Sequence, residues 1–595
     1  MSTKQSGSSR LKPQYGSDLI VDLIKAMEIE YVAFNPGSTF RGLHDSIVNY
    51  GGNKSPEVIT CCHEEISVAI AHGYAKASGR PMVAIVHDVV GLQHATMAIY
   101  NAWCDRVPVL VLGGCAPMDS VKRRPWIDWV HTALVQGNLV RDFVKWDDQP
   151  ASVEAFPESL IRALRVATTD PEGPVYVCFD YDLQEQPLNH PIALPDLSRY
   201  APPRPIQADS ESLRQAAEML VNANAPVVVA DVLGKNHEAV DALVNLAELL
   251  ALPVIDKGGS HQGRPCFPNN HPLDLTGAEG ELLSKTDLVL ALDVDDLYGG
   301  LVVSDPKTRA FKYVVPESAK IIHVNKGDLF IRSWATDYQR LTAVDLPLAA
   351  DSGVVLPALK ELAQKLLKPE RAAEMQERYQ SLKARHDALR AQWQEETDKK
   401  WDELPISSPR LAAEVWSVIK DEDWVLTRGT LHGWARKLWE WNKPYQYVGG
   451  CPGAGLGYGL GASLGAALFH KRWDRLCIDL QSDGDLLFTP SALWTAAHHQ
   501  IPLLIVIWNN RSYYNSEHHQ ALIAKLRNRP VENSVIGTRL EDPVVDYTQL
   551  ARSFGVYAED TVHKPEQLGP ALKAAIRVVK EDKKPALVDV WAQSR

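Results

Sequence analysis

Short apolar runs alternate with helical patterns along the 595 residues of this chain. Runs without polar alternation are typical of strands that are buried on both faces of a parallel sheet. The pattern predicts such strands over residues 83–86, 107–112, 175–179, 227–230, 288–292, 321–324, 476–478, 503–507 and 587–590. Because strand and helix signals alternate, we expect α/β layers that are built on parallel sheets.

Two breaks in composition divide the chain. Residues 193–206 are rich in proline and indicate a linker. Residues 369–404 are highly charged and carry an apolar stripe with helical spacing, which consists of Met375, Tyr379, Leu382, His386, Leu389 and Trp393. Such a helix either forms a contact seam or connects two domains while it lies on its own domain. We therefore predict three doubly wound α/β domains with parallel sheets, at residues 12–192, 205–365 and 405–595, and a helical linker at 366–404.

Composition and charge narrow the range of partners. The chain is 45% hydrophobic and 23% charged, as in ordinary globular proteins, and its formal net charge of −12 argues against nucleic acid or an anionic membrane as the main partner. No apolar run is long enough to span a membrane, and the polar start lacks the apolar core of a signal peptide. The eight cysteines are scattered and form no CxxC pair, which favours reduced thiols and a cytoplasmic location.

The strongest chemical signal is the segment Ser482-Asp483-Gly484-Asp485, followed by Asn509-Asn510. Both follow predicted strands, and ligands of parallel α/β sheets bind at the carboxyl ends of strands. A carboxylate and an amide oxygen are hard ligands that suit Mg²⁺ together with diphosphate oxygens, and Gly484 lets the backbone approach phosphates closely. Taken singly, each segment is also compatible with an ordinary turn.

This segment resembles the signature of thiamine diphosphate enzymes, in which Asp-Gly is followed by a spacer, here residues 485–508, and then by Asn-Asn. That family usually has Gly at the position of Ser482. The resemblance implies that Asp483, the Asn510 side chain and the backbone oxygen of Ser512 bind Mg²⁺. It also implies that Gly484 and Asp485 belong to the loop that binds the cofactor diphosphate, so that residues 405–595 form a diphosphate- and Mg²⁺-binding domain.

A second segment, residues 62–75, resembles the helix of this family that carries its catalytic glutamate, and the matching position is Glu64. The resemblance implies that Glu64 shares a proton with the aminopyrimidine of thiamine diphosphate, and that residues 12–192 form the pyrimidine-binding domain. Proton sharing of this kind favours a buried carboxyl group with a raised pKa. The alternative, a glutamate on a helix surface, is our interpretation of the neighbouring Glu65.

Residues 453–462 form a glycine-rich run that could also be a dinucleotide-binding turn, although a lone match of this kind is weak. In thiamine diphosphate enzymes the same glycines let a helix pack beside the cofactor. By that resemblance, Leu456 props the cofactor in its bent form and the Ala454 carbonyl receives its amino group. Thr430 and Leu431 match the turn that contacts the diphosphate.

Within this family, the chain resembles benzoylformate decarboxylases at Asn35-Pro-Gly-Ser38, at His87 and at residues 491–497. The resemblance implies non-oxidative decarboxylation of a 2-oxo acid, in which Ser38 holds the substrate carboxylate. A histidine near neutral pKa, here His87, can relay the proton that the product needs. The alternatives are a plain turn serine and a histidine that is satisfied by a backbone carbonyl.

Other reactions stay open, because the sequence departs from the decarboxylase pattern. Residues 293–300 lack the second histidine of those enzymes, and the unusual residues Tyr513, Tyr514, His518 and His519 could shape a different pocket. A carboligase or lyase of the acetolactate synthase or 2-hydroxyacyl-CoA lyase type is the main alternative, with an acyl substrate near Lys525, Arg527 and Arg529. The sequence supports two further alternatives less well, namely a catalytically silent protein with this fold and a nicotinamide dehydrogenase. FAD is neither indicated nor excluded.

The resemblance also bears on assembly. In this family the cofactor lies between the first domain of one subunit and the third domain of another. We therefore expect a homodimer or homotetramer with active sites between subunits, acting on a small-molecule 2-oxo acid or acyl substrate.

Overall fold

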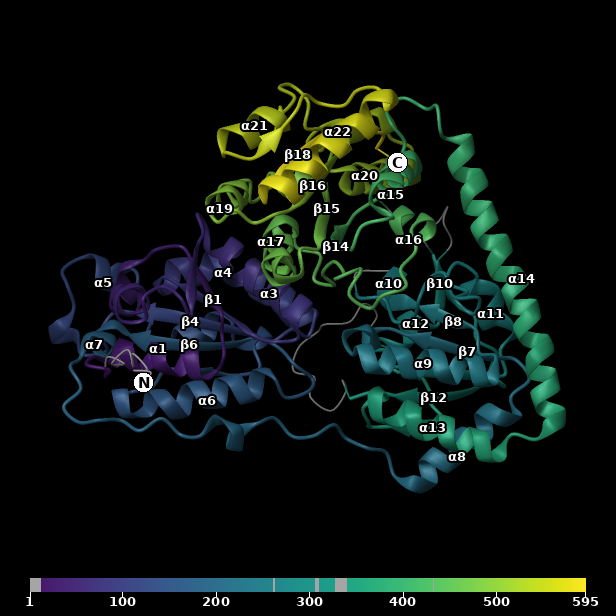
Figure 1. Ribbon diagram of the computed structural model, residues 1–595, viewed down its shortest axis with the longest axis horizontal. Coiled ribbons are helices and arrows are strands. Elements are labelled where there is room, and N and C mark those ends of the chain that lie inside the picture. The colour runs from purple at the N-terminus through teal and green to yellow at the C-terminus, as the bar shows by residue number, and fades with distance from the viewer. Residues whose placement is uncertain (1–11, 261–262, 305–309, 327–339, 432, 595) are drawn as a thin grey trace, which may run out of the picture. The chain divides into compact units, whose positions relative to one another are not determined.

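Three parallel β-sheets flanked by helices form the framework of the protein (Figure 1). The computed structural model describes residues 12–260, 263–304, 310–326, 340–431 and 433–594. The chain divides into two units, which are described separately. The N-terminal unit comprises residues 1–75 and 80–203, and the C-terminal unit comprises residues 76–79 and 204–595. The division after residue 203 falls inside the proline-rich segment.

The N-terminal unit contains one six-stranded parallel sheet in the order β2-β1-β3-β4-β6-β5. Its strands are β1 (Tyr31–Phe34), β2 (Glu57–Thr60), β3 (Met82–Val86), β4 (Val109–Cys115), β5 (Asp147–Asp148) and β6 (Val175–Asp180). Apolar residues from three helices and the sheet form one core; the helices are α1 (Gly16–Ala26), α2 (Arg41–Asp45) and α6 (Phe156–Ala167). The amphipathic spacing of α6 places Leu160 and Ala163 in this core.

Two helices of the N-terminal unit start at the carboxyl edge of this sheet. Helix α3 (Glu64–Ser78) follows β2, and α4 (Asp88–Cys104) follows β3. Their first turns therefore lie where polar side chains can gather outside a parallel sheet. Shorter helices complete the unit: α5 (Ile127–Val130) and α7 (Tyr181–Glu185).

The C-terminal unit begins with a five-stranded parallel sheet in the order β13-β12-β9-β7-β8. The strands are β7 (Pro226–Ala230), β8 (Val254–Asp256), β9 (Leu288–Leu292), β12 (Lys320–Val324) and β13 (Leu346–Leu348). Three helices share a core with the sheet: α8 (Ser210–Asn222), α9 (His237–Leu250) and α13 (Ser352–Leu366). Around it lie α10 (Lys257–Ser260), α11 (Glu279–Lys285), α12 (Leu297–Gly300) and the antiparallel pair β10 (Val302–Ser304) and β11 (Phe311–Tyr313).

The long charged helix α14 (Pro369–Lys399) runs beside this central sheet (Figure 1). Met375 is buried in the core of the central sheet, and Tyr379 and Leu382 pack against the same core. The His386 Nδ1 atom lies 2.8 Å from the backbone oxygen of Asp274. The predicted stripe therefore packs on the central sheet, as expected for a connecting helix that lies on its own domain.

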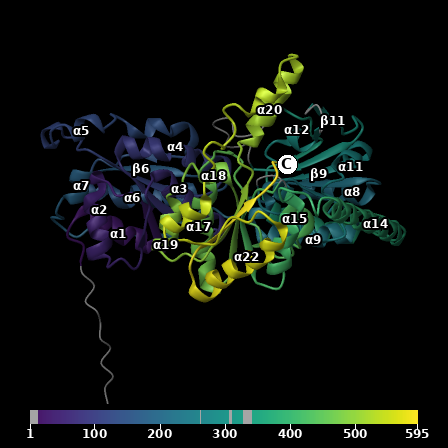
Figure 2. The ribbon, with the colours of Figure 1, turned by 90° about the horizontal axis from the view of Figure 1, so that it is seen from above.

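A second five-stranded parallel sheet completes the C-terminal unit, in the order β14-β15-β16-β18-β17. Its strands are β14 (Trp424–Gly429), β15 (Leu476–Ser482), β16 (Leu504–Asn509), β17 (Tyr557–Ala558) and β18 (Ala586–Trp591). Helices around it are α15 (Ser408–Ile419), α16 (Trp434–Leu438), α17 (Tyr458–His470), α18 (Asp483–Leu486), α19 (Ala492–His498), α20 (Tyr514–Leu526), α21 (Tyr547–Ser553) and α22 (Pro565–Arg577). Figure 2 shows α20 extending away from this sheet.

The predicted fold class, three α/β domains with parallel sheets, is confirmed. Every predicted strand overlaps an observed one; residues 107 and 108 lie before β4, residue 503 lies before β16, and all other predicted strand residues lie within observed strands. The sequence analysis did not predict β1, β2, β5, β8, β10, β11, β13, β14 and β17. The exact domain boundaries stay predictions. In the described part of the chain, no helix combines the length and the apolar character that crossing a membrane requires.

Candidate functional site

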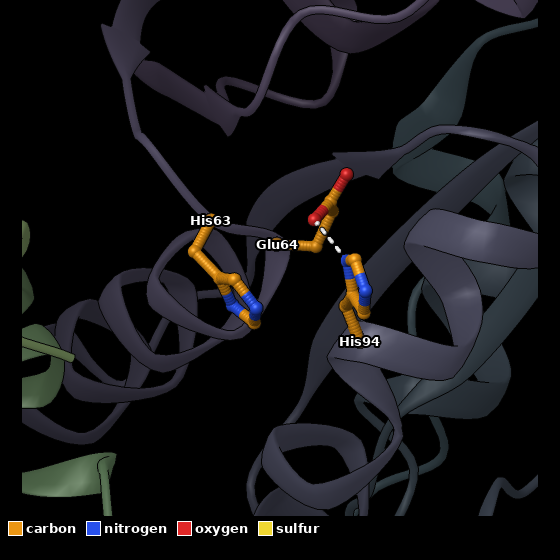
Figure 3. A group of neighbouring side chains, drawn as sticks. All are labelled: His63, Glu64 and His94. Atoms are coloured by element: carbon orange, nitrogen blue, oxygen red, sulfur yellow. Dashed lines mark hydrogen bonds and ion pairs between the residues drawn. The ribbon is translucent and has the colours of Figure 1, made fainter. Parts of the chain in front are cut away.

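Glu64 lies at the first position of α3 and is only 4% exposed. Its Oε1 atom accepts a hydrogen bond from Asn35 Nδ2 at 3.0 Å, and its Oε2 atom lies 3.1 Å from His94 Nδ1. Figure 3 shows the Glu64 carboxylate beside the His94 ring, with His63 opposite that ring. Helix α4 passes so close that a Cβ added at Gly91 would lie 3.0 Å from Glu64 Oε1. The carboxylate is thus held from several sides.

The electrostatic surroundings of Glu64 differ from the sequence-based expectation. Burial raises the pKa of this carboxyl group, but the hydrogen bonds from Asn35 and His94 outweigh burial, so that the pKa lies below its ordinary value. The expected raised pKa is therefore wrong for the N-terminal unit taken by itself. That two side chains donate to the same carboxylate could not be read from the order of the residues.

Ser38 and His87 lie in one neighbourhood of the same unit. The His87 Nδ1 atom lies 2.9 Å from Thr39 Oγ1, and a Cβ at Gly37 would lie 2.4 Å from the Cβ of His87. The partner of His87 is thus a hydroxyl group rather than the backbone carbonyl of the alternative reading. Burial and nearby His131 lower the pKa of His87, which favours the neutral ring. The Ser38-Thr39 segment therefore packs directly on the histidine.

Arg124, which is partly exposed, connects Ser38 to buried Asp128 through an ion pair that sequence reasoning missed. Its Nη2 atom donates to Ser38 Oγ at 3.4 Å and to Asp128 Oδ1 at 2.7 Å. Asp128 also accepts from the Tyr181 hydroxyl at 2.7 Å. Residues 86 positions apart meet here, so only the fold brings them together. Ser38 also borders a pocket of about 550 Å³ that is lined by Pro36, Gly37, Arg41, His44, Asp45, Val48 and Asn49.

Asp88, the residue after His87, is a second group that sequence reasoning missed. It is 1% exposed, and burial raises its pKa to about 7. Its φ of 47° places a non-glycine residue in the left-handed region, a strained conformation that is enriched at functional sites. The rule that polar residues gather at strand ends could have found this residue.

In the C-terminal unit, Asp483 lies at the end of β15 and is 1% exposed. Its oxygens accept from two backbone amides, Gly484 N–H at 2.9 Å and Arg511 N–H at 2.6 Å. Burial nevertheless raises the pKa of Asp483 to about 6. Asn510 is buried beside it, and its Oδ1 atom accepts from Ser512 N–H at 2.9 Å. The strand ends thus bring Asp483 and the Asn510 turn together, as the spacing predicted.

The residues of this turn fit a hard divalent cation. Burial keeps the pKa of the Asp483 carboxyl group raised, because the two backbone amides and the positive charge of Arg511, which lower it, compensate the buried charge only in part. A divalent cation would supply the missing positive charge. Gly484 cannot carry a side chain, since a Cβ there would lie 2.6 Å from the Tyr513 ring. Among the described residues, His63, Glu64 and His94 are the one group of three His, Cys, Asp or Glu residues close enough to share a metal ion.

Asp485 turns toward the glycine-rich run. Its Oδ1 atom accepts from Gly457 N–H at 2.6 Å, and its Oδ2 atom lies 3.8 Å from Arg428 Nη2. That buried Oδ2 atom has no hydrogen-bond partner in the described part of the chain. The carboxylate therefore joins two loops and pairs with a cation, a contact that the expected role in diphosphate binding did not include.

The remaining predicted residues surround the start of α17. Ala454 and Gly457 have φ values of 51° and 91°, so the run before the helix is a tight turn. Leu456 is 38% exposed, although it is a large apolar residue, and this suits a contact with a bound molecule. In the described residues 433–457 no strand leads into this turn, whereas a dinucleotide-binding turn directly follows a strand.

Thr430 and Leu431 lie after β14. Thr430 Oγ1 donates to the Leu480 backbone oxygen at 2.7 Å, and Leu431 is buried in the core of the last sheet. The Leu431 side chain therefore packs inside the domain, so a contact with diphosphate would have to use its backbone. The basic residues Lys525, Arg527 and Arg529 lie exposed at the end of α20.

Comparison with known families identifies the class of protein. Residues 14–139 match the N-terminal TPP binding domain of thiamine pyrophosphate enzymes, residues 213–359 match the central domain, and residues 427–590 match the C-terminal TPP binding domain. Together these matches cover more than half of the chain, in the order expected. The chain belongs to the thiamine pyrophosphate enzyme family, as the sequence motifs predicted.

Two curated relatives illustrate the range of this family. The chain is 25% identical to the "Probable acetolactate synthase large subunit" of Methanocaldococcus jannaschii, over 94% of this chain and 90% of that protein. It is 27% identical to benzoylformate decarboxylase of Pseudomonas aeruginosa, over 93% of this chain and 97% of that protein. Both kinds of activity had been predicted as possibilities, and the two relatives do not separate them.

A solved structure matches the fold over almost the whole chain. The crystal structure of benzoylformate decarboxylase from Polynucleobacter necessarius superposes with a TM-score of 0.75 at 18% identity, and the match covers 98% of this chain and 99% of that one. At this identity the match concerns the fold alone.

Proposed function

We propose that this protein is a thiamine diphosphate- and Mg²⁺-dependent enzyme that cleaves a C–C bond of a 2-oxo acid by non-oxidative decarboxylation. The observation that carries the proposal lies in the N-terminal unit, where His87 contacts Gly37 and Thr39, the two neighbours of Ser38, and lies close enough to buried Glu64 to feel its charge. A proton-transfer carboxylate, a hydroxyl group and a neutral histidine are the groups that such a reaction needs.

In this proposal the C-terminal unit anchors the cofactor. The Asp483 carboxylate, the Asn510 side-chain oxygen and the Ser512 backbone oxygen hold Mg²⁺, and the backbone of Gly484 lies next to the diphosphate. Thr430, the Leu431 backbone, Ala454 and Leu456 border the cofactor. Bound thiamine diphosphate supplies the electron sink that accepts the electron pair left when CO₂ departs.

The protein residues handle the protons and the substrate. The ionised Glu64 carboxylate takes up a proton from the cofactor at one of its oxygens and returns it. Ser38 binds the substrate carboxylate, with the Arg124 guanidinium beside its hydroxyl oxygen. The lowered pKa of His87 keeps its ring neutral near pH 7, so the ring can pass a proton to and from the product.

The second candidate is carboligation or C–C lysis, in which the same residues act on a second carbonyl group or on an acyl thioester. The similarity to an acetolactate synthase supports it, and the exposed cluster Lys525, Arg527 and Arg529 offers charge for a nucleotide-bearing substrate. Cytoplasmic location, supported by eight free cysteines, belongs to the same proposal.

The assembly that we propose is a homodimer or homotetramer with sites between subunits. Mixing Glu64→Gln with Asp483→Ala protein, each inactive alone, tests it. If the sites are shared between subunits, mixed oligomers contain intact sites and activity returns. Continued inactivity after demonstrated subunit exchange would contradict shared sites.

A product assay by NMR tests the reaction. Purified protein with thiamine diphosphate and Mg²⁺ is supplied with aromatic, branched and short 2-oxo acids, singly and with an aldehyde acceptor, and Glu64→Gln protein is the matched control. Aldehyde and CO₂ from one 2-oxo acid support decarboxylation. Hydroxyketone products alone would favour carboligation instead, and no product would make acyl thioesters the next substrates to test.

A further inference from the structure

His94 contacts the carboxylate on which the proposed chemistry depends. Its Nδ1 atom lies 3.1 Å from Glu64 Oε2, while Asn35 Nδ2 donates to Glu64 Oε1 at 3.0 Å. An ionised carboxylate only accepts hydrogen bonds, so His94 must carry a proton on Nδ1 when Glu64 is ionised. Of these two partners of Glu64, Asn35 is an amide and His94 is an imidazole, whose proton can lie on either ring nitrogen.

His63 supports the His94 ring from the other side. The two rings stack with centroids 4.8 Å apart and an interplanar angle of 23° (Figure 3). The His63 ring is itself fixed, because Glu65 N–H donates to its Nδ1 atom at 3.2 Å. The side chain of His94 is 56% exposed, so its ring can exchange protons with water while it touches the buried carboxylate.

We propose that His94 is a positioning residue, which donates from Nδ1 to Glu64, holds the carboxylate in place and keeps it ionised. This inference rests on the proposed function, because it concerns the same proton-transfer carboxylate. His94 acts through Glu64 rather than on the substrate. The His63 ring keeps the imidazole of His94 oriented for this contact.

The charged and titratable groups around Glu64 define the expected pH behaviour. Besides His94, the titratable neighbours are His63, at the start of α3, and His87, at the start of α4. Removal of the His94 donor raises the pKa of Glu64, since that hydrogen bond lowers it. The pH midpoint of any reaction step that requires ionised Glu64 must then move to higher pH.

A metal ion is the competing explanation of this cluster, because one ligand atom from each of His63, Glu64 and His94 lies within 4.8 Å of the others. Two observations oppose it. The two rings stack face to face instead of converging on one point, and the Nδ1 atom of His63 already accepts a backbone hydrogen bond.

The test measures hydrogen–deuterium exchange at the acidic ring carbon of bound thiamine diphosphate, in the holoenzyme without substrate, as a function of pH. Acid quenching followed by proton NMR gives the rate. We expect His94→Ala to move the midpoint upward by about one pH unit, which corresponds to an approximately tenfold slower exchange on the acidic side. His94→Asn keeps a donor without a titrating ring and should shift the midpoint less.

The control variant is His190→Asn, an exposed histidine of the same unit, which should keep the wild-type midpoint. An unchanged midpoint in both His94 variants would overturn the inference. If His94→Ala does not fold, the His94→Asn profile decides by the same criterion. Stoichiometric Co²⁺ binding, seen by absorbance and lost in both His63→Ala and His94→Ala, would also overturn it. Absence of exchange in wild-type holoenzyme would instead contradict the proposed function.

Discussion

Two buried carboxylates, Glu64 and Asp483, lie at comparable places in their units, each just after a parallel strand and at the start of a helix. Their surroundings differ. Glu64 is hydrogen-bonded by two side chains and its pKa is lowered, whereas Asp483 is hydrogen-bonded by two backbone amides and its pKa is raised to about 6. Burial destabilises both charges, so the partners decide the sign.

The difference suits the two roles that we propose. A buried carboxylate whose charge is compensated only in part, as that of Asp483 is, is prepared for a cation, which supplies further positive charge on binding. A carboxylate that accepts hydrogen bonds from side chains, as Glu64 does, can take up or release a proton without a bound cation. The comparison thus separates anchoring of the cofactor by Asp483 from proton transfer by Glu64.

Glu64→Gln should have the largest effect on catalysis. The amide keeps the size of the side chain, but its NH2 group cannot accept one of the two hydrogen bonds and the side chain cannot exchange a proton. Turnover should therefore fall by about 1,000-fold, within the usual range for a general acid or base. Cofactor affinity should change little. Steady-state turnover with the substrate found by NMR measures the first quantity. Wild-type turnover in this variant would remove Glu64 from its role.

Asp483→Ala should act on binding instead. Loss of the charged ligand should weaken Mg²⁺-dependent cofactor binding by at least about 100-fold, or ~2.8 kcal/mol. Cofactor and Mg²⁺ retained after gel filtration measure this effect. Asp560→Ala, at a side chain that is 98% exposed, is the control and should retain both. Full retention in Asp483→Ala protein would exclude the anchoring role.

Arg428→Met tests the pair that supports the anchoring loop. Without Arg428, the buried Asp485 carboxylate keeps only its bond from Gly457 N–H, and the free energy of unfolding should fall by about 2–3 kcal/mol. Urea denaturation followed by tryptophan fluorescence measures the loss, with exposed Arg80→Met as control. Addition of Asp485→Asn should restore more than half of it. Additive losses in the double variant would mean that the two residues are not coupled.

The pH dependence of stability should separate the two carboxylates by sign, with effects of about 1–2 kcal/mol. The lowered pKa of Glu64 stabilises the fold above the pKa of unfolded glutamate, and this contribution is lost as pH falls through the folded pKa. Glu64→Gln should therefore destabilise the protein near pH 7 and not in acid. The raised pKa of Asp483 has the opposite effect, so in metal-free protein Asp483→Asn should stabilise the fold above pH 6.

Thermal unfolding of both variants between pH 4 and pH 8, with and without Mg²⁺, measures this difference. Mg²⁺ should remove the advantage of Asp483→Asn, because the cation compensates the buried charge of the wild-type protein. If both variants changed the stability of metal-free protein near pH 7 in the same direction, the contrast between the two carboxylates would be contradicted.

Much of the fold and part of the site could be predicted from the sequence, for a physical reason. Buried parallel strands are continuous apolar runs, and functional polar residues follow them directly, so the meeting of Asp483 and Asn510 could be inferred from two strand ends. Strand β14 was missed because its apolar run is interrupted by Thr427 and Arg428 before it ends.

The contacts that set the electrostatics could not be predicted in this way. The pairs Glu64–His94 and Arg428–Asp485 join side chains from different elements, and no periodicity encodes which side chain lies opposite which. The raised pKa expected for Glu64 was therefore wrong, since burial was foreseen and the donors were not. Arg124 beside Ser38 was missed for the same reason.

Calorimetric titration of thiamine diphosphate into Glu64→Gln and Asp483→Asn proteins, over a series of Mg²⁺ concentrations, tests the central claim most directly. The account predicts that Glu64→Gln protein keeps the wild-type dependence of affinity on Mg²⁺, while Asp483→Asn protein binds weakly at every Mg²⁺ concentration. Mg²⁺-dependent affinity that survives in Asp483→Asn protein, or disappears in Glu64→Gln protein, would contradict the division of roles between the two carboxylates.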